Sequence, residues 1–224
     1  MAEAPDWPKV LSLTVHEFRT PLTVVAGYLH MLSGDRVGPL TDAQRRVIDE
    51  AARSCSRMSA LLSEVSEVAH FHQGRLSYLR GPVSLSRIMQ SIELTPGAER
   101  RLVIGNGIDV EIEGDATRLG RAFSAVASAV ARETIDSDDV HVLPALRDGP
   151  AGREAFIAIG SGAVAHEILE APPADLSDFD ATRGGNGLSL VIARQVLQEH
   201  HGRLYGALGE RARAGAAIAL PLSS

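Results

Sequence analysis

The sequence has few of the features that define several large classes of protein. It contains one cysteine, Cys55, so it can form neither an internal disulfide nor a cysteine-based metal cluster. No apolar run approaches the length that crosses a membrane, and the first ten residues lack the apolar core of a signal peptide. Lys9 is the only lysine, and arginine carries nearly all of the positive charge. We therefore expect a cytoplasmic protein with no membrane segment.

The overall composition is that of an ordinary globular protein. Of the 224 residues, 45% are hydrophobic and 22% are charged, and the length allows one large domain or two modest ones. The formal net charge is −6, whereas a nucleic-acid-binding protein is expected to carry a basic face. Nucleic acid is therefore not an expected partner.

The first third of the chain has two segments with heptad spacing. In residues 11–32 the apolar positions are separated alternately by four and three residues, which is typical of a helix that packs along one seam. Gly34, Gly38 and Pro39 interrupt this pattern, and Thr41 and Asp42 offer caps for a second helix. The two sets of seam positions are Leu11, Val15, Phe18, Leu22, Val25, Leu29 and Leu32, and then Ile48, Ala51, Cys55, Met58, Leu62, Val65 and Ala69.

Two heptad helices joined by a short turn predict an antiparallel hairpin over residues 1–73. A single hairpin has one narrow seam and is marginally stable alone. Two copies side by side form a four-helix bundle and bury both seams. We therefore expect a homodimer, with a linker over residues 74–82 that has little regular structure.

Residues 83–224 have a different pattern, in which short strands alternate with helices. We expect helices in 83–92, 115–133 and 187–201, and two strands around the Gly-Asn-Gly turn at 105–107. Hairpins are expected from 140–148 with 153–160 and from 203–209 with 214–222. Helices mixed with hairpins predict an α+β fold, an α/β sandwich rather than a doubly wound parallel sheet.

The string HEFRTPLT, residues 16–23, resembles the phosphoacceptor box of the sensor histidine kinases of two-component signalling. It lies on the first helix of a heptad hairpin, as it does in that family. The second half resembles the ATP-binding domain of these kinases in the order and length of its elements. The resemblance thus covers nearly the whole chain and implies a homodimer whose partner is the receiver domain of a response regulator.

His16 follows the seam residue Val15, so it projects from the flank of the bundle. A neutral imidazole is a competent nucleophile near physiological pH. The resemblance implies that Glu17 orients the ring and accepts its proton, and that Thr20, one turn further along, helps to hold the water that dephosphorylates the receiver. The receiver would dock near His16 and Thr20. The alternative for His16 is an ordinary surface histidine, but its neighbours argue against this.

The other seven histidines have no such neighbours. The pairs His70/His72 and His200/His201 lack a carboxylate or cysteine at ligand spacing, so we interpret them as surface residues and expect no metal site.

The residues that the resemblance assigns to nucleotide binding depart from the family pattern. Gly185, Gly187 and Leu188 stand where backbone amides would meet phosphates at a helix N-terminus, and Arg132 could still meet a phosphate. The two asparagines expected on the helix after Asp115, however, fall at Ala125 and Ala129, and alanine offers no oxygen to Mg²⁺. The aspartate that accepts from the adenine amino group is replaced by Gly160. No asparagine occurs between Gly107 and Gly185, and the interval from 162 to 184 is short for an ATP lid.

Three functions are compatible with this pattern. The first is a histidine phosphotransferase derived from a kinase, in which His16 exchanges phosphoryl groups with receiver aspartates. The second is an ATP-dependent autophosphorylating kinase with an atypical nucleotide site, which would use ATP and Mg²⁺. The third is a non-catalytic scaffold. The intact residues His16, Glu17 and Thr20 favour the first.

Overall fold

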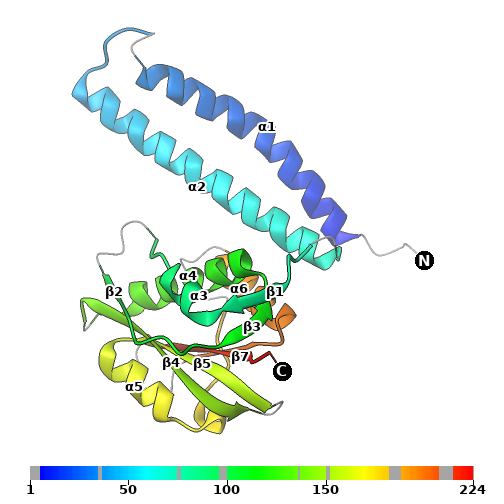
Figure 1. Ribbon diagram of the computed structural model, residues 1–224. Helices are drawn as coiled ribbons and strands as arrows, with labels where there is room; N and C mark the ends of the chain where they lie inside the picture. Colours follow the sequence, from blue (N-terminus) through cyan, green and yellow to red (C-terminus); the bar gives the residue numbers. More distant parts are fainter. Residues whose placement is uncertain are drawn as a thin grey trace. The chain divides into compact units, whose positions relative to one another are not determined.

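The computed structural model describes residues 6–34, 37–74, 77–95, 100–135, 137–149, 152–181, 188–206 and 214–223. The chain divides into two compact units, Met1–Ser77 and Tyr78–Ser224 (Figure 1). Within the described ranges, no helix combines the length and the apolar content that a membrane span requires.

The first unit is a hairpin of two long helices, α1 (Trp7–Ser33) and α2 (Asp42–His72). Helix α1 starts at Asp6, whose carboxylate accepts from the Lys9 N–H. Helix α2 starts with a capping box, in which Thr41 and Gln44 each accept a hydrogen bond from the other's backbone N–H. The predicted hairpin is confirmed, and its turn lies at the glycine-containing break that the sequence indicated.

The two sets of heptad positions on α1 have different environments. Val15 is buried against α2, and Leu22 and Leu29, one and two heptads further on, are half-buried. Leu11, Phe18, Val25 and Leu32 form the other set; the first three are 37%, 60% and 48% exposed in the single chain, and Leu32 is half-buried. On α2, Cys55 and Ala69 are buried, while Met58 is 49% exposed. The hairpin therefore leaves four of the fourteen predicted seam positions exposed.

The second unit contains a five-stranded sheet, a two-stranded sheet and four helices among its described residues. Its elements are β1 (Gly81–Ser84), α3 (Leu85–Gln90), β2 (Arg101–Ile104), β3 (Glu111–Gly114), α4 (Ala116–Glu133), β4 (Asp139–Gly149), β5 (Gly152–Gly160), α5 (Gly162–Glu170), a short 3-10 turn (Pro173–Asp175), α6 (Ser189–Glu199), β6 (Arg203–Tyr205) and β7 (Ala216–Pro221). The larger sheet has the order β2-β4-β5-β7-β6, and all neighbours are antiparallel except β2 and β4. The predicted α+β class is confirmed.

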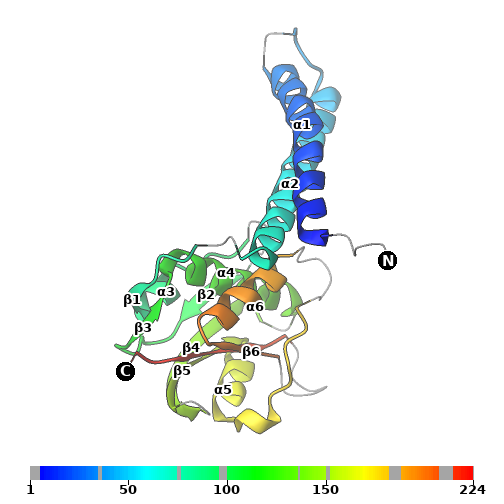
Figure 2. The same ribbon diagram turned by 90° about the vertical axis from the view of Figure 1, so that its right-hand side faces the viewer.

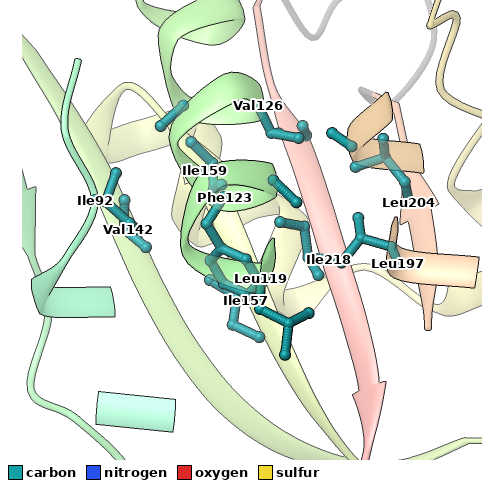
Figure 3. Close-up of a cluster of buried hydrophobic side chains, with 14 of the residues drawn as sticks. Ile92, Leu119, Phe123, Val126, Val142, Ile157, Ile159, Leu197, Leu204 and Ile218 are labelled. Carbon is teal, nitrogen blue, oxygen red and sulfur yellow. The ribbon is translucent and has the colours of Figure 1, made fainter. Parts of the chain in front are cut away.

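Helices cover both faces of the five-stranded sheet. Figures 1 and 2 show α4 and α6 on one face and α5 on the other. The central strand β5 is therefore buried on both sides, with Ile157 and Ile159 facing the larger core and Phe156 and Ala158 facing the smaller one. Figure 3 shows the larger core, where side chains of α4 and α6 meet those of β4, β5, β6 and β7.

Three expectations about this unit were incomplete. Strands β2 and β3 exist, but they do not pair with each other: β2 pairs with β4, and β3 pairs with β1. Strand β1 begins at Gly81, inside the segment expected to be an irregular linker. Helix α5 was not expected at all. The β4–β5 and β6–β7 hairpins are confirmed.

Candidate functional site

The phosphoacceptor candidate lies on the outside of the helical hairpin. The side chains of His16 and Glu17 are 77% and 73% exposed, and His16 Nδ1 lies 3.7 Å from Glu17 Oε1. The neighbouring Val15 is buried against α2, so the seam fixes the rotation of α1 and turns His16 outward. Glu17 thus approaches the ring of His16 from the Nδ1 side.

Thr20 is one helical turn beyond His16 and is also exposed. Pro21 has no N–H to donate to the preceding turn, yet α1 continues through it to Ser33. His16, Glu17 and Thr20 are thus presented together on one exposed stretch of helix, as expected from the sequence. The roles of Glu17 and Thr20 stay predictions.

Two of the four residues predicted to contact a nucleotide lie in the described part of the second unit. Arg132 is exposed in the last turn of α4, and Leu188 directly precedes α6. Gly185 and Gly187 lie outside the described residues. The assignment of these four positions to phosphate binding remains a prediction.

The positions expected to carry asparagine offer no metal ligand. Ala129 is buried in the larger core, and Ala125 packs against it. A shift of the alignment by one residue would place Ser124 and Ser128 there instead. Both hydroxyls already bind backbone, since Ser124 Oγ accepts from the Glu93 N–H at 3.1 Å and Ser128 Oγ from the Thr95 N–H at 3.0 Å. These serines anchor the segment after α3 to α4.

The end of β5 is closely packed where the family aspartate would stand. A Cβ atom on Gly160 would lie 2.9 Å from Val164 Cγ1 and 3.3 Å from the Ala165 backbone nitrogen. Real Cβ atoms avoid such distances, so the first turn of α5 occupies the space that a side chain at residue 160 needs. In this fold an aspartate at position 160 does not fit without moving α5.

The segment after α5 runs along the edge of the sheet. Asp178 forms an antiparallel bridge with Tyr205 in β6, and the Gly206 N–H donates to the Ser177 carbonyl at 2.8 Å. Leu176 packs into the smaller core and Phe179 into the larger one. This part of the interval that was expected to be a shortened lid is therefore fixed on the edge of the sheet.

One expectation about the histidines was wrong. His200 is 4% exposed, because it lies under Tyr78, whose ring is 5.5 Å away, and against the start of α4. Its Nε2 accepts from the Asp115 N–H at 2.9 Å, and its Nδ1 donates to the Val196 carbonyl at 2.7 Å. Burial lowers the pKa of His200 below its ordinary value. His200 is thus a neutral structural residue that joins α6 to α4.

Asp115 completes this junction. Its carboxylate accepts from the Leu79 N–H and the Arg118 N–H, each at 3.0 Å. Burial by itself would raise the pKa of Asp115, but these N–H groups and the Arg118 charge outweigh burial and hold the pKa below its ordinary value. Asp115 thereby caps α4 and anchors the first residues of the second unit.

Two of these features escaped the sequence-based interpretation. The close packing at Gly160 depends on α5, whose Ala165 and Ile168 have helical spacing and follow a possible cap at Ser161. The contacts of Ser124 and Ser128 had no sequence signal, because their partners are backbone groups about thirty residues away.

Comparison with known families agrees with this arrangement of the first unit. Residues 9–74 match the His Kinase A (phospho-acceptor) domain family. The phosphate regulon sensor protein PhoR of Pseudomonas aeruginosa is 26% identical over 200 residues, which are 84% of this chain and 44% of PhoR. The sensor protein VanS of Enterococcus faecium is 22% identical over 205 residues, 88% of this chain and 52% of VanS. The chain thus spans about half the length of these relatives.

Solved structures share the fold of both units. Full-length ShkA in complex with AMPPNP superposes with a TM-score of 0.63 at 22% identity, covering 97% of this chain and 46% of ShkA. The histidine kinase AdeS of Acinetobacter baumannii gives a TM-score of 0.57 at 13% identity, covering 93% and 98%. The chain is a homologue of the sensor histidine kinases, with a phosphoacceptor domain of the His Kinase A type.

Proposed function

We propose that this protein is a histidine phosphotransferase of two-component signalling, in which His16 exchanges a phosphoryl group with the aspartate of a response-regulator receiver domain. In the forward step Nε2 of His16 attacks the phosphorus, an N–P bond forms and the acyl P–O bond of the aspartyl phosphate breaks. Glu17 takes the Nδ1 proton as the ring becomes phosphorylated. Reversal of the same steps returns the phosphoryl group to a second receiver.

The observation that carries this proposal is the contrast between the two units. The phosphoacceptor side chains are intact, exposed and adjacent. In the second unit, α5 crowds residue 160, where the adenine-binding aspartate was expected, and neither alanine on α4 offers an oxygen. Because Mg²⁺ neutralises much of the charge in phosphoryl transfer from ATP, the loss of its ligand disfavours autophosphorylation.

The exposed positions of the heptad seam support a homodimer. Leu11, Phe18 and Val25 form an apolar stripe on α1, and Met58 continues it on α2. A second hairpin would cover this stripe and complete a four-helix bundle. His16 lies beside the stripe, so the receiver would dock on the flank of the bundle near His16 and Thr20.

The proposal is tested by incubating the protein with phosphorylated receiver domains of the same organism, without nucleotide. Label should move from at least one receiver to the wild-type protein and to His30→Ala, which alters an exposed histidine on the same helix. His16→Ala should accept none. Labelling of His16→Ala, or no transfer to the wild type from any receiver, would contradict the proposal.

A second candidate is an ATP-dependent histidine kinase core. Homology to sensor kinases favours it, and the structurally similar ShkA was solved with AMPPNP bound. Retention of the box GGNGL at 184–188 also favours it. This candidate requires a nucleotide site that works without the two asparagines and the aspartate, and it predicts label on His16 from ATP alone.

A further inference from the structure

A cluster of charged side chains on the second unit has no part in the phosphoryl exchange proposed above. It consists of Arg147 on β4, Glu154 on β5 and Arg203 on β6, with the rings of Phe156 and Tyr205, and we call it the arginine cluster. The strand register places these residues on the face of the sheet that carries α5.

The carboxylate of Glu154 is fully used by the two arginines. Its side chain is 8% exposed, its Oε1 accepts from Arg147 Nε at 2.9 Å, and its Oε2 accepts from Arg203 Nη2. Two guanidinium groups therefore share one carboxylate, and among the described residues of the cluster one positive charge is left over. In partly buried surroundings such a charge is costly unless an anion offsets it.

The remaining donors of Arg147 have no acceptor among the residues that the structure describes. Its Nη1 and Nη2 are both buried and without a hydrogen-bond partner. Arg147 Cζ lies over the Phe156 ring, 3.3 Å from its centroid, and 5.8 Å from the centroid of Tyr205. The aromatic faces stabilise the cation, but they accept none of its N–H bonds, which lie in the guanidinium plane. Buried donors of this kind are normally satisfied by an ordered water or ion.

We propose that the arginine cluster binds a small oxyanion, a carboxylate or a phosphate group, on the free Nη edge of Arg147. Paired guanidinium N–H groups bind two oxygens of such a group side by side. One negative charge would balance the excess charge of the cluster. The Arg203 side chain is 39% exposed, against 15% for Arg147, so Arg203 is the outer group that would move to admit the anion.

The test is a titration of the full chain with inorganic phosphate, and separately with acetate, at ionic strength held constant with sodium chloride. The readout is the set of ¹H–¹⁵N signals of the Arg147 side chain and the Tyr205 amide. Saturable shifts of these signals are expected below about 50 mM anion, since the movement of Arg203 that admits the anion costs part of the binding free energy. Saturation by both anions would identify a general oxyanion site, and saturation by phosphate alone would identify a phosphate site.

Two arginine-to-lysine variants distinguish the site from general charge effects. Arg147→Lys keeps the charge but removes the paired N–H groups, and it should weaken the saturable binding by about tenfold or more. Arg153→Lys alters an exposed arginine on the same β4–β5 hairpin and should bind as the wild type does. Shifts in the wild type that stay linear for both anions, or equal binding by Arg147→Lys, would overturn the proposal and leave water as the partner of Arg147.

Discussion

Gly160 at the end of β5 lies against Val164 of α5, so that a Cβ on Gly160 would stand 2.9 Å from Val164 Cγ1. Strand and helix are separated only by Ser161, and the helix folds back directly onto the strand end. Packing therefore favours glycine at the position to which the resemblance assigned the adenine-binding aspartate. The absence of an acid at residue 160 agrees with the close packing of α5 against the end of β5.

Restoring the aspartate should not restore a nucleotide site. Gly160→Asp should lower the free energy of unfolding by about 1–3 kcal/mol, because the new side chain overpacks the first turn of α5. Thermal unfolding should show a lower Tm, with no added stabilisation by Mg²⁺-ATP. Ala163→Asp is the control, because residue 163 is exposed and an acid in the first turn of a helix is tolerated. An undiminished Tm together with ATP binding in Gly160→Asp would contradict this account of the site.

Two adjacent valines on α1 test the dimer. Val25 is one of the exposed seam positions and Val24 lies outside the seam, yet their exposures are 48% and 51%. We expect Val25→Asp to dissociate the dimer, since it would bury unpaired carboxylates in the bundle core. Val24→Asp should remain dimeric. Light scattering at micromolar concentration measures the mass of each, and the same mass for both variants would refute this arrangement of the seam.

The junction at His200 predicts a pH-dependent stability of the second unit. Because the pKa of His200 in the folded protein is lowered, the unfolded chain binds the proton more tightly. The stabilisation is thus complete above the unfolded pKa of about 6.5 and falls as the pH drops through it towards the folded pKa.

Variants of His200 and of its neighbour His201 distinguish the titration of His200 from that of the other ionisable groups. His200→Ala should lower the free energy of unfolding at pH 8 by about 1–3 kcal/mol and flatten its decline between pH 8 and 5. His201→Ala, at an exposed position, should keep the wild-type decline. Chemical denaturation at a series of pH values measures both. A His200→Ala variant that keeps the full decline would assign the pH dependence elsewhere.

Removing the carboxylate of Glu17 should slow phosphotransfer without changing the fold or the dimer. Glu17→Gln keeps the shape of the side chain but accepts no proton, so the rate of transfer to His16 should fall by about 10²–10⁴-fold. The fold and the dimer should be unchanged, because Glu17 is exposed. Single-turnover transfer from a phosphorylated receiver gives the rate. A variant that transfers at the wild-type rate would remove Glu17 from the mechanism.

Periodicity predicted the helical hairpin because its determinants are local. The heptad spacing of Val15, Leu22 and Leu29, the break after Ser33 and the capping residue Thr41 each act within a few residues of their position. The exposure of His16 followed from its place beside Val15. In the second unit the β4–β5 hairpin was predicted for the same reason.

The features that escaped prediction depend on contacts between distant segments. β2 and β3 follow each other closely, but each pairs with a strand elsewhere in the chain, and the turn between them carries no sign of this. From the sequence His200 was interpreted as a surface residue. Its burial depends on Tyr78 and Asp115, which are distant in the sequence. Likewise, the glycine at 160 indicated a lost ligand, whereas its packing against Val164 became evident only in the fold.

The most direct test of the central claim is a calorimetric titration of the purified protein with Mg²⁺-ATP, combined with a γ-phosphate labelling assay on the same sample. If His16 exchanges phosphoryl groups only with receivers, the titration gives no binding heat and ATP leaves no label on the protein. Tight binding of Mg²⁺-ATP with label on His16 would contradict the account and define a working kinase with a rebuilt nucleotide site.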